Sequence, residues 1–337
     1  MYPFDVIHIG LGKCMSTYLQ NTWARDPAIR NIEGRQVAQA VNQAMVNHAQ
    51  SGAELPEFDL NFKSADVPNR VLTAEGFTFS FLNDAEMGKF IPLKHRFVAR
   101  TLAGFAPRVL MVVRDPVAWI ASAHAQSINQ GGFRDRQAFV KECRASVLNN
   151  LNIDGIMQAY ADEGFEMVVL PMELLAEEPD HFWALLEQTC GLATPSNRRS
   201  LSRTDENRTH HDKLALAATL NRVQARLADG VRRGGEADAE AVLQTLGHAQ
   251  AWGARRGLSG ADEETLADLH TLVNCADAED FLAYEVDEDF VGALRRDFIT
   301  PLESVETVAP MLGRYTASLD ALLTSPDQRR QTPPPHR

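Results

Sequence analysis

Over roughly the first 190 residues, short apolar runs alternate with stretches of helical periodicity. The apolar runs, typical of buried strands, cover residues 4–9, 71–74, 108–113 and 166–171. Helical spacing is found in residues 117–128, 137–162 and 179–190, the last followed by Gly191 as a stop signal. Residues 31–66 mix polar and small apolar positions and predict a helix followed by a loop. Strands separated by helices predict an α/β fold with three layers, in which a parallel sheet is covered on both faces.

The pattern changes near Arg232-Arg-Gly-Gly-Glu236, which is the best candidate for a domain boundary. Just before it, apolar residues at helical spacing favour a core stripe: Leu216, Leu220, Val223 and Leu227. Beyond it, helices with acidic faces are expected in residues 237–252, 261–276 and 287–323. We therefore expect an α/β core over 1–230 and a helical extension or cap over 231–325, which could also support an oligomer. The proline-rich tail, 326–337, is expected to be disordered.

The first apolar run leads into His8-Ile-Gly-Leu-Gly-Lys-Cys-Met-Ser-Thr-Tyr-Leu-Gln20, which opens an amphipathic helix. A strand, a tight turn with a lysine and two hydroxyls, and a helix N-terminus together suit a phosphate or sulfate group. Backbone N–H groups and the helix dipole favour an anion there, and Lys13 adds a positive charge. The segment is not a Walker A loop, because the lysine comes too early and the first glycine of GxxxxGK, six positions before the lysine, is absent.

A second motif follows the run at 108–113. Arg114 stands at the carboxyl end of this predicted strand, and Asp115-Pro116 begins a helix. Ser122 lies eight residues after Arg114 on that helix. Together these two side chains could hold a second phosphate.

In this order, the two motifs resemble those of sulfotransferases that use 3′-phosphoadenosine 5′-phosphosulfate (PAPS). The resemblance covers about the first 125 residues and implies a P-loop-like fold whose first loop binds the phosphosulfate. It implies that Lys13 stabilises the leaving phosphate. It also implies that Ser16 and Thr17 bind the 5′-phosphate, that Tyr18 stacks on adenine, and that Arg114 and Ser122 bind the 3′-phosphate.

The loop also departs from the family pattern. Gly12 replaces the usual proline, and Met15, preceded by Cys14, stands where the family has glycine. Met15 can serve if its backbone is helical, whereas a positive φ there would strain the site and favour a weak or inactive member. For Cys14, packing is expected rather than redox sensing.

The reaction also needs a base for the acceptor proton. Glu75 follows the strand predicted at 71–74, at the sheet edge where ligand sites gather in α/β folds. It also resembles a position where several carbohydrate and peptide sulfotransferases carry a catalytic glutamate. A capping or ion-paired carboxylate is the structural alternative. His95 and His124 are rival bases, because histidine titrates in the useful range.

Other histidines and basic residues are expected to have ordinary roles. His95 lies in Lys94-His95-Arg96, which is typical of a solvated basic patch, and His8 is expected in the core. His210-His211-Asp212 is expected on the surface rather than as a metal site. A dense basic run is a candidate lid over the nucleotide, with a solvated loop as the alternative: Arg198, Arg199, Arg203 and Arg208.

Composition and cysteine content narrow the classes of function that the chain can have. A net charge of −12 argues against nucleic acid as a partner, so a polyanionic nucleotide must be met by a local cationic cluster. No apolar run approaches 18 residues and no signal peptide is recognisable, so we expect a cytoplasmic chain without a membrane span. No metal-ligand cluster is expected. The cysteines lack CxxC spacing and are expected to be reduced thiols: Cys14, Cys143, Cys190 and Cys275.

The sequence thus predicts transfer of a sulfuryl group from PAPS to a hydroxyl or amine of an unidentified acceptor, such as a glycan or a small molecule. Lys13 and Glu75 are the expected catalytic residues, and no metal is expected. Two alternatives stay open. A P-loop nucleotide kinase or NTPase would need Mg²⁺, although the chain lacks GxxxxGK[ST] and a clear strand-end aspartate. A non-catalytic protein that binds the bisphosphate would explain Met15.

Overall fold

A computed structural model describes residues 2–60, 69–196, 198, 213–222, 225 and 278–323. The chain divides into two compact units. The first is formed by Met1–Trp119, Ala145–Arg203 and Val286–Arg337, and the second by Ile120–Arg144 and Thr204–Glu285. The predicted boundary after residue 230, the helices expected at 237–252 and 261–276, and the tail at 326–337 lie outside the described residues.

A five-stranded parallel sheet, ordered β2-β3-β1-β4-β5, forms the centre of the first unit. The strands are β1 (Val6–His8), β2 (Arg30–Glu33), β3 (Arg70–Thr73), β4 (Arg108–Val113) and β5 (Glu166–Pro171). On β1, Ile7 pairs with Leu72 of β3 and with Val109 of β4. All three side chains are fully buried, as expected for a sheet covered on both faces. The predicted α/β class and the four predicted strands are confirmed.

The edge strand β2 was not predicted. Its residues, Arg30-Asn31-Ile32-Glu33, include one apolar side chain and are half-buried or exposed. It pairs with β3 on one side, which supplies backbone hydrogen bonds that no hydrophobic pattern reveals. The helix expected after it is present as α2 (Arg35–Ser51).

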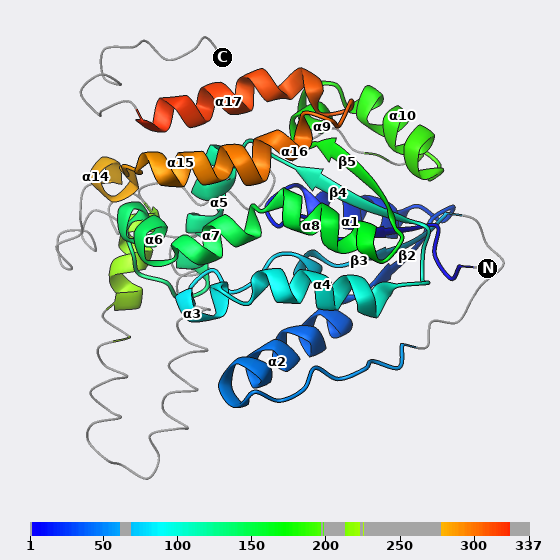
Figure 1. The fold of residues 1–337 in the computed structure, drawn as a ribbon. Coiled ribbons are helices and arrows are strands. Elements are labelled where there is room, and N and C mark those ends of the chain that lie inside the picture. The colour runs from blue at the N-terminus through cyan, green and yellow to red at the C-terminus, as the bar shows by residue number, and fades with distance from the viewer. Residues whose placement is uncertain are drawn as a thin grey trace. The chain divides into compact units, whose positions relative to one another are not determined.

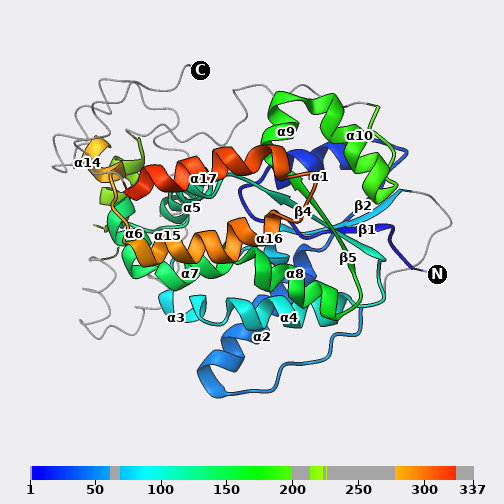
Figure 2. The ribbon, with the colours of Figure 1, turned by 45° about the horizontal axis from the view of Figure 1, so that its top comes forward.

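Helices lie on both faces of the sheet. Figures 1 and 2 show α2, α4 (Ile91–Leu102) and α8 (Ile153–Asp162) on one face, and α1 (Ser16–Arg25), α9 (Met172–Glu177) and α10 (Pro179–Cys190) on the other. This placement follows from right-handed crossovers, because the chain moves from β1 toward β2 in one direction and from β3 toward β4 in the other. The shorter elements of this part are the 3₁₀ turn η1 (Glu75–Phe77), α3 (Ala85–Gly88) and α7 (Arg144–Asn150).

The strand order places the loop after β1 at the topological switch point of the sheet. From β1 the chain leaves toward α1, whereas from the neighbouring strands β3 and β4 it leaves toward the opposite face. Crevices that bind ligands form at such points, outside the carboxyl ends of the strands. The loop after β1 therefore lies between the ends of β3 and β4.

The end of the described chain returns to the first unit. Its elements are α15 (Glu288–Leu294), the π-helical turn η2 (Arg295–Ile299), α16 (Thr300–Leu302) and α17 (Ala309–Leu323). The Thr307 hydroxyl donates to the Val169 carbonyl of β5 at 2.5 Å. The segment 287–323 thus contains the predicted helices, and part of it packs beside the sheet.

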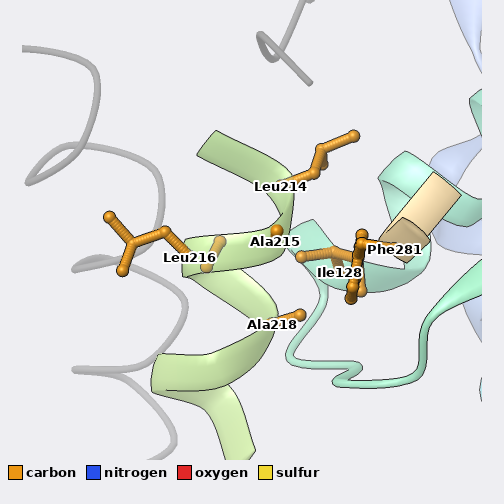
Figure 3. Close-up of a cluster of buried hydrophobic side chains, with 7 residues drawn as sticks. Ile128, Leu214, Ala215, Leu216, Ala218 and Phe281 are labelled. Atoms are coloured by element: carbon orange, nitrogen blue, oxygen red, sulfur yellow. The ribbon is translucent and has the colours of Figure 1, made fainter. Parts of the chain in front are cut away.

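The second unit contains most of α5 (Pro116–Asn129), α6 (Arg136–Glu142), a helix over 213–222, and α14 (Ala278–Leu282). The helical spacing found over 137–162 corresponds to three helices, α6, α7 and α8, and Asn152 caps α8 by accepting from Gly155 N at 2.8 Å. In Figure 3, Ala215 and Ala218 face Ile128 and Phe281, whereas Leu216 lies on the other side of its helix. Leu216 is fully buried and Leu220 packs against this cluster, so the predicted apolar stripe is core as far as it is described.

Candidate functional site

The loop between β1 and α1 has an unusual backbone. Lys13 and Met15 have φ values of 69° and 62°, in the left-handed region that favours glycine. Met15 is the N-cap of α1, and its carbonyl accepts the first helical hydrogen bond, from Leu19 N at 3.1 Å. The loop therefore does require a positive φ at the position where a glycine was expected, and Met15 adopts it at a cost of roughly 1–2 kcal/mol.

Two residues that follow neighbouring strands bond the backbone of Lys13, one at its N–H and one at its carbonyl. The Lys13 N–H donates to Glu75 Oε1 at 3.0 Å, and the Lys13 carbonyl accepts from Arg114 Nη1 at 3.3 Å. Glu75 follows β3 and Arg114 follows β4, so the three residues come from the ends of three adjacent strands. The structure thus brings together the predicted lysine, glutamate and arginine.

Packing beneath the loop explains Gly12. The indole N–H of Trp119 donates to the Gly12 carbonyl at 2.6 Å, and the Trp119 ring meets Phe79 edge-on at 6.0 Å. A Cβ added at Gly12 would lie 2.2 Å from Phe79 Cγ, which is too close for any side chain. Glycine at position 12 is therefore required by the packing of this chain's own core.

Ser16 supplies an unsatisfied donor at the start of α1. Its side chain is 3% exposed, and its Oγ has no hydrogen-bond partner among the described residues. A Cβ at Gly10 would lie 2.6 Å from that Oγ, so Gly10 leaves space beside the hydroxyl. A buried polar group without a partner costs about 1–3 kcal/mol, and an anion at the helix N-terminus would satisfy it.

The remaining loop side chains have different environments. Thr17 is exposed and Tyr18 half-buried, so both stand near the surface. Cys14 is fully buried, and its thiol points to the Gly12 carbonyl at 3.8 Å. Burial raises the pKa of this thiol well above its usual value, with smaller effects from nearby charges. The packing role predicted for Cys14 is confirmed.

Glu75 also lines a cavity of about 220 Å³. The cavity lies among α1, the end of β2, α2 and the turn at the end of β3. Its lining residues are Gln20, Glu33, Arg35, Ala38, Gln39, Asn42, Ala74, Glu75 and Gly76. Glu75 therefore contributes to two features: it bonds the loop that carries Lys13, and it lines the cavity beside that loop.

The prediction of a solvated basic patch at Lys94-His95-Arg96 is wrong for its first two residues. Lys94 and His95 are 0% and 1% exposed. Lys94 Nζ donates to the Gly76 carbonyl at 2.7 Å, and His95 Nε2 lies 3.3 Å from the Thr78 carbonyl. Burial lowers the pKa of Lys94 to about 7 and that of His95 to about 3.

Two further candidate histidines, His8 and His124, are also buried. His8 Nδ1 hydrogen-bonds Thr73 Oγ1 at 2.9 Å, while its Nε2 has no partner among the described residues. His124 Nε2 lies 2.9 Å from the Arg134 carbonyl. Burial lowers the pKa of His8 to about 3 and that of His124 to about 4. The core position predicted for His8 is confirmed. Low pKa values make His95 and His124 weaker bases than their usual range suggests.

Glu173 is a residue of this region that sequence reasoning missed. It begins α9, directly after β5, and is 6% exposed. Its Oε1 accepts from Asp115 N at 2.9 Å and its Oε2 accepts from the Tyr315 hydroxyl at 2.6 Å. It therefore fixes the turn that presents Arg114. Its place after a strand end, like that of Glu75, is the signal that could have revealed it.

Two predicted nucleotide-binding features stay predictions. Ser122 is half-buried on α5 in the second unit. Within the basic run, Arg198 forms an ion pair with Asp180 at 2.9 Å, and the other three arginines lie outside the described residues.

Over the described ranges, no group of three or more His, Cys, Asp or Glu side chains could hold a metal ion. No helix in the same ranges is long and apolar enough to cross a membrane. His210-His211-Asp212 is outside them. Compared with known proteins, the chain gives no significant match to a family model, to a curated protein or to a solved structure.

Proposed function

We propose that this protein is a sulfotransferase that moves the sulfuryl group of PAPS to a hydroxyl or amine of an acceptor. The observation that carries the proposal is the Lys13 peptide held between Glu75 and Arg114, with the unsatisfied Ser16 hydroxyl at the following helix N-terminus. In this proposal the fold is a P-loop-like three-layer α/β core whose first loop binds the phosphosulfate.

Each residue then has a distinct task. Backbone N–H groups of the loop, with the Ser16 and Thr17 hydroxyls, bind the 5′-phosphosulfate. Arg114 binds the 3′-phosphate, and Tyr18 stacks on adenine. The Lys13 ammonium stabilises negative charge on the leaving phosphate.

The transfer itself is a displacement at sulfur. The acceptor oxygen or nitrogen forms a bond to sulfur while the bond from sulfur to the phosphate oxygen breaks. Glu75 takes the acceptor proton. Because Oε1 accepts from Lys13 N, Oε2 is the atom assigned to receive it. Positioning and charge stabilisation supply most of the catalysis in such transfers.

A cytoplasmic enzyme is part of the proposal. Its support is that Cys14, Cys143 and Cys190 are buried and form no disulfide within the described residues.

A second candidate is a protein that binds the bisphosphate without turnover. The left-handed backbone of Met15 favours it, because a side chain at a position that suits glycine adds strain and bulk where the phosphosulfate approaches.

Calorimetric titration with 3′,5′-adenosine bisphosphate, beside ATP and GTP with magnesium, tests the proposal. Micromolar binding of the bisphosphate without magnesium is the expected result, and transfer from radiolabelled PAPS then separates the enzyme from the non-catalytic binder. A magnesium-dependent triphosphate signal without bisphosphate binding would overturn the proposal in favour of a kinase or NTPase.

A further inference from the structure

The cavity beside Glu75 has an unusual lining. Three of its nine lining residues carry carboxamides, Gln20, Gln39 and Asn42, and three more carry charges, Glu33, Arg35 and Glu75. The rest are two alanines and a glycine. No aromatic or branched aliphatic side chain lines it. Its walls therefore offer many hydrogen-bonding groups, next to apolar surface from the alanine methyls and side-chain methylenes.

Two of the amides have specific environments. Asn42 Oδ1 is buried and has no hydrogen-bond partner among the described residues. Gln20 Nε2 donates to Thr73 Oγ1 at 3.2 Å, and the same hydroxyl bonds His8 Nδ1, so the Gln20 amide is anchored to the core. A buried acceptor that lacks a donor costs free energy, which a ligand hydroxyl would recover.

Small residues allow two walls of the cavity to approach each other closely. A Cβ added at Gly76 would come within 3.0 Å of Ala38 Cβ, so α2 lies close against the turn that carries Glu75. Glu33 and Arg35 pair with each other at 2.7 Å and are more than half exposed, which limits what this pair adds to binding. The discriminating groups are the carboxamides.

We propose that this cavity binds the acceptor and that the acceptor is a small polyhydroxylated molecule, a single sugar ring or a comparable polyol. Carboxamides both donate and accept, as hydroxyl groups do, so amides and hydroxyls pair in either direction. A volume of about 220 Å³ lies below the range of about 300–1,000 Å³ typical of drug-sized ligands, which fits one ring. Phenols and long alkyl alcohols carry a single hydroxyl, which would leave most of the cavity's amide and carboxylate groups without a hydrogen-bond partner, so they are disfavoured.

The assignment of the bound molecule as a sulfate acceptor rests on the proposed function, whereas its binding does not. Glu75 links the two, because this residue lines the cavity and its carboxylate accepts the Lys13 N–H. A hydroxyl bound in the cavity would give its proton to Glu75 as its oxygen bonds to sulfur.

The binding test needs no co-substrate. Saturation-transfer NMR on the full chain would compare monosaccharides and linear polyols with phenols and alkyl alcohols of similar size, followed by titration of the best binder. Gln39→Ala and Asn42→Ala each remove one amide from the cavity. Gln43→Ala is the matched control, because Gln43 lies on the same helix, is exposed and contacts Asn47 instead. Alanine favours helix at all three positions.

We expect a polyol to bind, Asn42→Ala to weaken it by about tenfold because its Oδ1 is buried, and Gln39→Ala to weaken it by about threefold because Gln39 is exposed. The control variant should bind as the unaltered protein does. All four proteins should keep the same affinity for 3′,5′-adenosine bisphosphate. Preference for phenols or alkyl alcohols, absence of polyol binding, or equal effects of the control and cavity variants would each overturn the inference.

The two proposals fail separately. Polyol binding that is sensitive to Gln39 and Asn42, without bisphosphate binding, would leave the cavity as a polyol site and remove the sulfotransferase. Bisphosphate binding without polyol binding would leave the nucleotide site and remove this acceptor class.

Discussion

Replacing Lys94 by methionine tests how a buried ammonium shapes the stability of the region around Glu75. Lys94 is fully buried on α4, where Nζ donates to the Gly76 carbonyl at 2.7 Å and lies 5.9 Å from the centre of the Phe81 ring. Burial alone lowers the pKa of this lysine from 10.5 to about 7. The adjacent His95 has a pKa of about 3, so it stays neutral near and above pH 7.

The sign and size of the pH dependence of stability follow from the linkage between proton binding and folding. Between about pH 7 and 10.5 the unfolded chain keeps the lysine proton and the folded chain loses it. The free energy of unfolding therefore rises with pH across this window, by about 2 kcal/mol from pH 7 to pH 9. Methionine has a similar length and no charge, so Lys94→Met removes this dependence. It also leaves the Gly76 carbonyl without its donor, at a roughly constant cost of about 1 kcal/mol.

Urea unfolding, followed by tryptophan fluorescence at pH 7 and pH 9, measures the difference in stability between Lys94→Met and the unaltered protein. Trp23, Trp119 and Trp183 are buried in the first unit and report on it. We expect Lys94→Met to be more stable than the unaltered protein by about 3 kcal/mol at pH 7 and by about 1 kcal/mol at pH 9.

Lys89→Met is the control, because Lys89 is exposed and pairs with Glu86 at 2.7 Å. Its stability difference from the unaltered protein should not change between the two pH values. If the Lys94→Met difference were equally constant, the argument from a desolvated ammonium would be refuted.

Four further variants test the loop and its two supports. Lys13→Ala should lower turnover by at least ~100-fold through loss of charge stabilisation, and full activity in a radiolabelled PAPS assay would end that assignment. Glu75→Gln keeps an Oε1 acceptor for Lys13 N, so bisphosphate affinity should hold while transfer falls by at least ~100-fold; normal rates would transfer the base role to another group. Arg114→Ala should weaken bisphosphate binding by at least ~10-fold in calorimetry, more than it slows transfer, and unchanged affinity would remove Arg114 from the site. Met15→Gly should raise the free energy of urea unfolding by up to about 1 kcal/mol, since relief of the left-handed strain exceeds the entropy cost of glycine; a loss of stability would show that the Met15 side chain packs favourably.

The sequence predicted the elements whose signals are local. The strand-loop-helix around Lys13 and the strands ending at Glu75 and Arg114 follow from apolar runs and helix start signals, and their order implied that the three ends meet. The strand β2 escaped prediction because hydrogen bonds to β3, rather than apolar residues, define it.

Burial of charged residues could not be predicted, because it depends on contacts between distant segments. Lys94 is held by the Gly76 carbonyl, and Glu173 is held by Tyr315, 142 residues further along the chain. Both look like surface residues in a hydrophobic pattern. The positive φ at Met15 is equally invisible, because the need for it arises from the turn and not from the residue.

The two hydrogen bonds to the Lys13 backbone determine how the effects of substitutions at Glu75 and Arg114 combine. Because the N–H of Lys13 is held by Glu75 and its carbonyl by Arg114, these two residues fix the two peptide groups that flank the Lys13 Cα. Their effects should therefore be non-additive: once one hydrogen bond is lost the backbone of Lys13 can change its φ and ψ, and removing the other costs less. A double-mutant cycle with Glu75→Ala and Arg114→Ala should show a coupling energy, whereas Glu75→Gln, which keeps the acceptor oxygen, should not. The proposed function gives Glu75 a second task as the proton acceptor, beside the hydrogen bond to Lys13 N, and the two substitutions separate these contributions.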